Sequence, residues 1–264
     1  MNKIGFIGMG NMAMALAAGF LETGRVQAEN MCAFAPNQEK LRQNAQAVGF
    51  SACPSALAVV QKSDLVIMAC KPYQIEGVLA EPGVREALAE KAMVSVAIGW
   101  DFERYAPLLD SSTRLQYILP NTPVQVGEGV FLLEDRSSLT NEEQRWLEDL
   151  LGACGTVVKL PADLISAGSA VSGCGPAFIS MMMEAMADAA VKHGIRREDA
   201  YRLVAQTVIG TGRLMLESGE HPGVMKDAVC SPGGTTIRGV AALEHAGMRA
   251  AFMDAVDAAS GSIK

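Results

Sequence analysis

The spacing of hydrophobic residues changes near Pro161, and the two sides of this point predict different secondary structure. Before it, short apolar runs are separated by polar segments and bounded by glycine or proline. Such runs are typical of strands buried on both faces of a parallel sheet. They predict strands at residues 3–7, 31–35, 64–69, 93–98, 113–119, 130–133 and 156–160.

Helical segments alternate with these strands, and after Pro161 the helical spacing continues without a further strand. Alternation of strand and helix implies a parallel, doubly wound sheet with right-handed crossovers. In the first part we expect helices at residues 38–47, 54–61 and 142–151. In the second part we expect them at residues 163–171, 176–193, 198–218, 224–229, 236–246 and 248–260.

The turn after the first predicted strand has the pattern G-x-G-x-x-A, formed by Gly8, Gly10 and Ala13. Gly8 permits a tight turn, Gly10 lets the backbone approach a pyrophosphate, and Ala13 lets helix and strand pack closely. The alternative is a purely structural glycine turn. We therefore predict an α/β protein in which residues 1–160 form a doubly wound Rossmann-type domain and residues 161–264 an all-α domain.

The end of the second strand favours NADP over NAD. In NAD-selective folds an acidic residue ends this strand and binds the ribose 2′-hydroxyl. Here the strand ends in Ala35-Pro36-Asn37, without Asp or Glu. Asn37, the local backbone and Lys40 could accept a 2′-phosphate instead. NADH stays open as a second cofactor, because no arginine occupies the expected place.

Three polar residues follow other strands at the carboxyl edge of the sheet, where α/β folds bind ligands. Lys71 could contact the cofactor phosphates or ribose, or be a solvated loop lysine. Asn121 and Thr122 could face the nicotinamide or the substrate, or cap the turn.

The turn Ser231–Thr236 reads S-P-G-G-T-T and precedes a predicted helix. Proline restricts one backbone angle, and the two glycines, Gly233 and Gly234, permit positive φ. The paired threonines are candidates for the helix cap. Such a turn points backbone N–H groups at one spot and predicts a small-anion site. A tight helix connection without a ligand is the alternative.

Composition excludes several classes of function. The net charge is -7 and no dense Lys/Arg run occurs, so we expect no nucleic-acid partner. The six cysteines and three histidines are scattered, which argues against a metal site or a disulfide framework and favours the reducing cytoplasm. Glycines interrupt the apolar stretch at residues 3–21, so we do not read it as a signal peptide.

The second half of the chain is apolar enough to raise the question of a membrane. Residues 171–190 approach the composition of a span, but Glu184 and Asp188 interrupt them, so we expect a buried core helix and no membrane partner. A helical domain of this size exposes more apolar surface than one chain can cover. We therefore predict a homodimer through the helical domain.

Five stretches carry a resemblance that spans nearly the whole chain. They are GFIGMGNMA at 5–13, ACKP at 69–72, AVSGCGPAF at 170–178, EAMADAAVKHG at 184–194 and SPGGTTI at 231–237. Together they resemble the pyrroline-5-carboxylate reductase family. The resemblance implies reduction of Δ1-pyrroline-5-carboxylate to L-proline with NAD(P)H, the last step of proline biosynthesis. It also implies dimers through the helical part, some of which assemble further.

The resemblance also implies site residues. Substrate contacts come from Gly233, Gly234, Thr235 and Thr236, and Thr236 is the catalytic residue whose hydroxyl hydrogen-bonds to the ring nitrogen. Cofactor contacts are expected from Ile7, Gly8, Met9, Gly10, Asn11, Met12, Ala35, Pro36, Asn37, Ala69, Cys70, Lys71, Pro72, Val96, Ala97 and Ile98.

The chain departs from the family at three positions and leaves two other functions open. Cys174 stands where serine is usual, Ala56 where many members have asparagine, and Gly219 where some have glutamate. A β-hydroxyacid or 6-phosphogluconate-type dehydrogenase needs a lysine where this chain has Ile179. A non-catalytic NADPH-binding regulator would not need the turn at 231–236.

Overall fold

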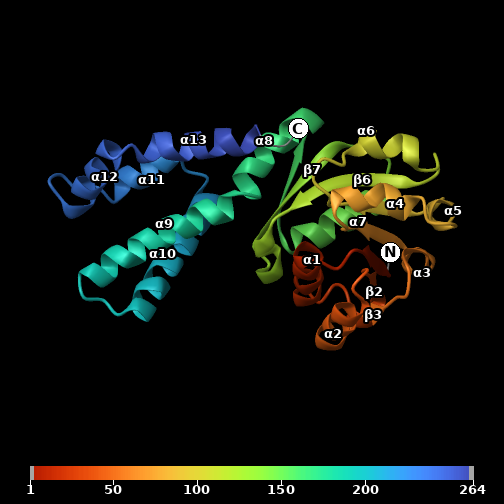
Figure 1. The fold of residues 1–264 in the computed structure, drawn as a ribbon. Helices are drawn as coiled ribbons and strands as arrows, with labels where there is room; N and C mark the ends of the chain where they lie inside the picture. Colours follow the sequence, from red (N-terminus) through yellow and green to blue (C-terminus); the bar gives the residue numbers. More distant parts are fainter. Residues whose placement is uncertain (1–2, 262–264) are drawn as a thin grey trace. The chain divides into compact units, whose positions relative to one another are not determined.

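The computed structural model describes residues 3–261 and divides into two compact units (Figure 1). One contains the chain up to Gly173 together with its end from Ser260, and the other contains residues 174–259. The predicted domain boundary at 160/161 lies earlier, because α8 (Ala162–Ser172) packs against strand β7 and so joins the first unit. The outer limits of the predicted domains, residues 1 and 264, lie outside the described residues.

The first unit is built on an eight-stranded sheet with the order β3-β2-β1-β4-β5-β6-β7-β8. Every predicted strand is present. The two-residue β3 was not predicted, because so short a strand has no apolar run. The bounds are β1 Ile4–Ile7, β2 Met31–Phe34, β3 Ser51–Ala52, β4 Leu65–Met68, β5 Ala92–Ser95, β6 Arg114–Pro120, β7 Gly129–Ser137 and β8 Gly155–Leu160.

The prediction of a parallel sheet is wrong at the β6–β7 pair, which is antiparallel, so β7 and β8 both run opposite to the other strands. The connection is the short 3-10 turn η4 (Thr122–Val126), which ends at Gly127 with φ +74°. A parallel pairing needs a crossover of about a dozen residues or more, and this connection is too short for one. The adjacent β8 is parallel to β7.

Helices cover both faces of the sheet, as a doubly wound fold requires (Figure 1). In β1, Ile4 and Phe6 pack on one face with helices α1, α2 and α7, while Ile7 packs on the other with α3 to α6. The short α4, α5 and α6 and the 3-10 turn η2 were not predicted. The bounds are α1 Asn11–Glu22, α2 Gln38–Val48, α3 Ala56–Lys62, η2 Pro72–Gln74, α4 Ile75–Leu79, α5 Val84–Leu88, α6 Phe102–Tyr105 and α7 Asn141–Gly152.

The second unit is helical, which confirms the predicted all-α region. Its hydrophobic core is small: Ala187, Ala200 and Val204 form the buried cluster between α9 and α10. The bounds are α9 Gly175–Lys192, α10 Arg197–Ser218, α11 Pro222–Ala228, α12 Thr235–His245 and α13 Met248–Ser260.

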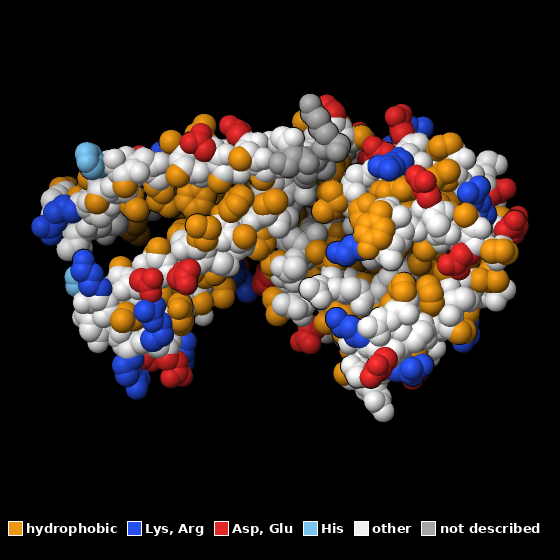
Figure 2. All heavy atoms as spheres, in the orientation of Figure 1, with side chains coloured by type: hydrophobic (Ala, Val, Ile, Leu, Met, Phe, Trp, Pro, Cys, Tyr) orange, Lys and Arg blue, Asp and Glu red, His pale blue; other side chains and the backbone are white. Residues whose placement is uncertain are grey.

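The helix expected to be a buried core helix is largely exposed within one chain. Among the described residues of α9, Ala187 is the buried one, and Met181 is 70% exposed. Hydrophobic side chains gather along the helices of this unit in Figure 2. The stretch 162–192 also has the length and hydropathy of a membrane span, a test that core helices of soluble proteins pass too. Among the described residues, α9 packs on α10, and side chains such as Met181 and Met186 on this helix stay exposed.

Candidate functional site

The glycine-rich turn after β1 forms a tight cradle at the start of α1. Gly8 has φ +97°, and its N–H donates a hydrogen bond of 2.8 Å to the carbonyl of Phe34. A Cβ on Gly8 would lie 2.4 Å from the Cys70 backbone nitrogen, whereas a Cβ on Gly10 would meet no described atom within 4 Å. Gly10 is also the N-cap of α1, and no described side chain caps this helix end. First-turn N–H groups and open space above Gly10 suit a phosphate.

A cavity of about 720 Å³ adjoins this cradle. It brings together ten of the sixteen predicted cofactor contacts together with Lys40, and it adds residues from η2 and α4 that the sequence did not predict. Asn11, Met12, Pro72 and Val96 to Ile98 do not line it. The lining residues are Ile7, Gly8, Met9, Gly10, Phe34, Ala35, Pro36, Asn37, Lys40, Leu41, Ala69, Cys70, Lys71, Gln74, Gly77, Val78 and Glu81.

Lys40 and Lys71 both line this cavity, which supports the ligand-binding interpretation of Lys71 over a solvated loop lysine. The Lys71 turn is held by hydrogen bonds between the backbone N–H of Lys71 and Gln74 Oε1 (3.1 Å) and between Gln74 N–H and Lys71 carbonyl (2.8 Å). Asn37 caps α2, because its Oδ1 accepts from the Lys40 N–H at 3.0 Å. The Asn37 Nδ2 and the two ammonium groups are therefore the donors available for a 2′-phosphate, and the Glu81 carboxylate is the opposing charge.

The loop after β5 contains Val96, Ala97 and Ile98. Hydrogen bonds of the residues on either side of it hold this loop in place. Ser95 Oγ and Tyr105 Oη lie 3.1 Å apart, and the Phe102 N–H donates to Glu134 Oε2 at 3.0 Å. Burial raises the pKa of the Glu134 carboxyl. Val96 and Ala97 are buried, whereas the Ile98 side chain is 54% exposed. The loop thus holds an apolar side chain at the carboxyl edge of the sheet.

Asn121 does not present its side chain to a ligand. It is 6% exposed, its Nδ2 donates to the Ser172 carbonyl at 2.9 Å, and its Oδ1 accepts from the Val130 N–H at 2.8 Å. The expectation that it could face nicotinamide or substrate is corrected by these bonds. Thr122 begins η4 and is exposed.

The turn before α12 differs in two respects from its sequence prediction. Gly233 has φ +68° as expected, but Gly234 has φ -70°. The Gly234 N–H donates to the Ser231 carbonyl at 3.0 Å, so Ser231 to Gly234 form a turn with proline and glycine in its central positions. The helix begins at Thr235 with Gly234 as N-cap and no side-chain cap. The threonines therefore lie inside the first helical turn, because Gly234 already occupies the capping position.

This geometry leaves the first N–H groups of α12 and the hydroxyls of Thr235 and Thr236 at one helix end, on exposed residues. Sequence reasoning missed Arg238, whose Nε donates to the Gly234 carbonyl at 3.3 Å. A basic residue four positions after the N-cap would have been the signal. Arg238 therefore places a positive charge within one helical turn of the α12 N-terminus, which would favour a small anion there.

The departure at Gly219 has a structural cause. This residue is the C-cap of α10 with φ +67°, a conformation that favours glycine over glutamate. Cys174, which stands where the family usually has serine, is the N-cap of α9. It has a right-handed helical conformation, and its side chain makes no capping hydrogen bond in the described structure.

Comparison with known proteins identifies the family. The pyrroline-5-carboxylate reductase from Treponema pallidum is 40% identical over 98% of this chain and 99% of its own. The enzyme of that name from Methanosarcina acetivorans is 40% identical over 98% and 95%. The chain belongs to the pyrroline-5-carboxylate reductase family. The resemblance in its motifs is thereby confirmed.

Family models and solved structures agree with this assignment. The model described as pyrroline-5-carboxylate reductase dimerisation matches residues 162–264, and the model described as NADP oxidoreductase, coenzyme F420-dependent, matches residues 3–99. The crystal structure of Plasmodium falciparum pyrroline carboxylate reductase with NADP bound has a TM-score of 0.87 to this reductase-family chain. It is 28% identical and covers 99% of this chain and 97% of its own. The predicted fold class is confirmed.

Proposed function

We propose that this protein reduces Δ1-pyrroline-5-carboxylate to L-proline with NADPH as the preferred cofactor and NADH as the second. The observation that carries the proposal is the turn at 231–236, which leaves the first N–H groups of α12 without a side-chain cap on exposed residues, in a chain of this family. A cyclic imino acid offers two groups to such a turn, a carboxylate and a ring nitrogen. When bound, NADPH supplies the hydride that reduces the C=N bond.

The cavity beside Gly10 fits a dinucleotide. The open space at Gly10 and the N–H groups at the start of α1 would hold the pyrophosphate, with Asn11 and Met12 in that first turn. Lys40, Lys71 and the Asn37 amide would hold the 2′-phosphate. We place the nicotinamide beside the other proposed contacts on the sheet edge, which are Pro72, Val96, Ala97 and Ile98.

The turn before α12 would bind and orient the substrate. Backbone N–H groups around Gly234 and Thr235 would hold the carboxylate, with Gly233 shaping the turn. Thr236 is the proposed catalytic residue, because its hydroxyl can hydrogen-bond to the ring nitrogen while the carboxylate is held. Orientation of two reactants can contribute up to about 7–11 kcal/mol to a reaction of this kind.

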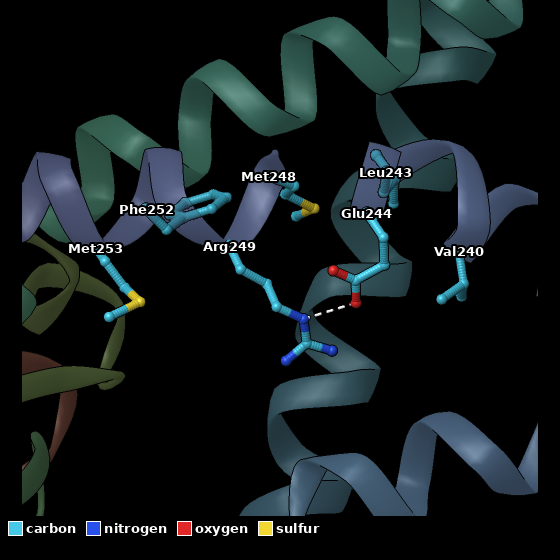
Figure 3. Close-up of a pocket in the computed structure, with 7 residues that line it drawn as sticks. All are labelled: Val240, Leu243, Glu244, Met248, Arg249, Phe252 and Met253. Carbon is cyan, nitrogen blue, oxygen red and sulfur yellow. Dashed lines mark hydrogen bonds and ion pairs between the residues drawn. The ribbon is translucent and has the colours of Figure 1, made fainter. Parts of the chain in front are cut away.

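The helical unit would form a homodimer. An apolar groove of about 520 Å³ lies between α9 and the α12–α13 pair, with Met181, Met186 and Phe252 among its lining residues. A second cavity of about 490 Å³ is formed by α12 and α13, and Figure 3 shows Leu243 and Met253 beside the ion pair of Glu244 and Arg249.

A second copy of this chain is the occupant that fits these grooves. The family model matched over the helical unit is described as a dimerisation region, whereas Glu184 and Asp188 on α9 would be costly in a bilayer. We therefore propose a homodimer in the cytoplasm, with assembly of dimers beyond it, and no membrane partner. The six cysteines are free thiols, which suits that compartment.

The experiment that tests the activity follows NADPH absorbance after addition of pyrroline-5-carboxylate to the purified protein, with proline measured as product. Thr236→Ser keeps the hydroxyl, and Thr236→Val removes it at similar volume. We expect Thr236→Val to lower kcat/KM by about 10²–10³, as loss of one positioned donor does, and Thr236→Ser to retain most activity.

Each alternative gives a different result. NADPH binding without turnover would indicate a regulator, and turnover only of a hydroxy acid with NADP would indicate a dehydrogenase. Either result would overturn the proposed reaction.

A further inference from the structure

The Asn121 amide connects three elements at the end of β6. Its Nδ2 donates to the carbonyl of Ser172 at the end of α8, and its Oδ1 accepts from the N–H of Val130 in β7. The backbone N–H of Asn121 also donates to the Val130 carbonyl at 3.2 Å. The residue is 6% exposed, so this amide is a buried polar group with protein partners at both ends.

The carbonyl that Asn121 binds has lost its ordinary helical partner. In an α-helix the carbonyl of Ser172 would accept from the N–H four residues later, and that residue is Pro176, which has no N–H. The chain nevertheless stays in helical conformation between α8 and α9, at Gly173 (φ -81°, ψ -43°) and Cys174 (φ -88°, ψ -29°). The Asn121 amide supplies the donor that the proline removes.

This junction is where the chain leaves the first unit. The division between the units falls between Gly173 and Cys174, and the chain returns at Ser260. The return is tied to α8 as well, since Ser166 Oγ donates to the Ser260 carbonyl at 3.0 Å. Both crossings therefore depend on α8, and Asn121 bonds the end of α8 to the carboxyl edge of the sheet.

We infer that Asn121 is a positioning residue for the proposed reduction, acting through the Ser172 carbonyl to hold the α8–α9 junction. The inference rests on the proposed function, because that reaction needs groups from both units: the cofactor cavity in the first and the 231–236 turn in the second. A misplacement of about 1 Å between reactants can cost about 10²-fold in rate. Asn121 itself touches neither reactant in this role.

Gln116 offers a matched control in β6, the strand that precedes Asn121. It is also a buried amide, 1% exposed, and its Nε2 donates to the carbonyls of Tyr117 and Glu134, both within the sheet. Asn121→Ala and Gln116→Ala thus each delete a buried amide, but only Asn121→Ala releases the α8–α9 junction.

The test compares kcat, NADPH affinity and melting temperature in these variants. We expect Asn121→Ala to lower kcat at least tenfold while the NADPH Kd, measured by fluorescence, stays within twofold. Gln116→Ala should lower the melting temperature comparably and leave kcat within twofold at temperatures where it is folded. If Asn121→Ala does not fold, Asn121→Asp retains the volume and the acceptor and loses the amide donor, with the same expectation.

A rescue separates positioning from general structural damage. Pro176→Ala restores a backbone N–H four residues after Ser172, so Asn121→Ala/Pro176→Ala should regain at least threefold in kcat over Asn121→Ala, with Pro176→Ala alone as reference. An unchanged kcat in Asn121→Ala, an equal loss in Gln116→Ala, or no rescue would overturn the positioning role alone. A wild-type protein without turnover would overturn the proposed function, and this role with it.

Discussion

A Cβ atom placed on Gly8 would lie 2.4 Å from the backbone nitrogen of Cys70, which joins the glycine cradle directly to the end of β4. Gly8 also has φ +97°, where an L side chain is strained. Gly8→Ala should therefore destabilise the protein by at least about 2 kcal/mol, since neither the backbone angle nor the backbone neighbour can adjust cheaply. Thermal denaturation measures this, and an unchanged melting temperature would contradict it.

At Gly10, in the same cradle, we expect a substitution to affect cofactor binding and not stability. Its φ of -83° is ordinary, and a Cβ there would meet no described atom within 4 Å. Gly10→Ala should keep the melting temperature but weaken NADPH binding at least tenfold, because the methyl group would occupy the space proposed for the pyrophosphate. Titration of NADPH fluorescence tests this. Wild-type affinity in Gly10→Ala would place the pyrophosphate elsewhere.

Lys40 and Lys71 should set the preference for NADPH. Each alanine substitution removes a cation from the cavity proposed to hold the 2′-phosphate, and a hydrogen bond to a charged group contributes about 1.5–3 kcal/mol. We expect Kd for NADPH to rise about tenfold with little change for NADH, and the difference to shrink at high salt. Lys159→Ala is the control, because Lys159 pairs with Glu148 outside the cavity. Equal losses for both cofactors would contradict the assignment.

Arg238 should contribute to substrate affinity. Its guanidinium bonds to the Gly234 carbonyl at the helix end proposed to hold the substrate carboxylate. Arg238→Ala should raise KM for pyrroline-5-carboxylate by about 3–10-fold, the effect expected for one cation near an exposed anion, and Arg238→Lys should retain part of the affinity. Steady-state kinetics with Arg136→Ala as a surface control would measure it, since Arg136 pairs with Glu103. An unchanged KM in Arg238→Ala would show that Arg238 does not contribute to substrate binding.

The ion pair of Arg114 and Glu143 should make the free energy of unfolding depend on pH in the acid range. Arg114 Nε and Nη2 donate to the Glu143 carboxylate at 2.7–2.9 Å and tie β6 to α7. Burial raises the pKa of Glu143, but hydrogen bonds from Arg114 and Thr140 outweigh it, so the net pKa is lowered. The stabilisation is therefore present above the unfolded pKa, about 4.3, and is lost as pH falls through the lower folded pKa.

Glu143→Gln tests this dependence. The substitution should cost about 1–3 kcal/mol at pH 7, because both side chains are largely buried and the pair is charge-assisted. As the pH falls from 6 through the folded-state pKa of Glu143, the free energy of unfolding should decrease more for the wild type than for the variant, as measured by urea denaturation. Parallel curves for the two proteins would show that the pair does not contribute.

The hydrophobic pattern alone determined most of the first unit. Continuous apolar runs such as 65–68 and 31–34 have no polar face that could be exposed to solvent, so they favour a sheet that is covered on both sides. Gly8 and Gly10 predicted the position of the cradle after β1, because the steric requirements of such a turn involve only a few neighbouring residues. Strand and helix identities of this kind depend on local sequence, and the structure agrees with them.

Tertiary structure decided the features that depend on contacts between distant residues. The antiparallel pairing of β7 with β6 and the Asn121 amide bonded to Ser172 fifty-one positions away have no strong local signal. The same holds for α9, whose apolar composition predicted burial although most of its described side chains are exposed within one chain. Periodicity states which side chains must leave water, but only the packing of the whole molecule determines what covers them.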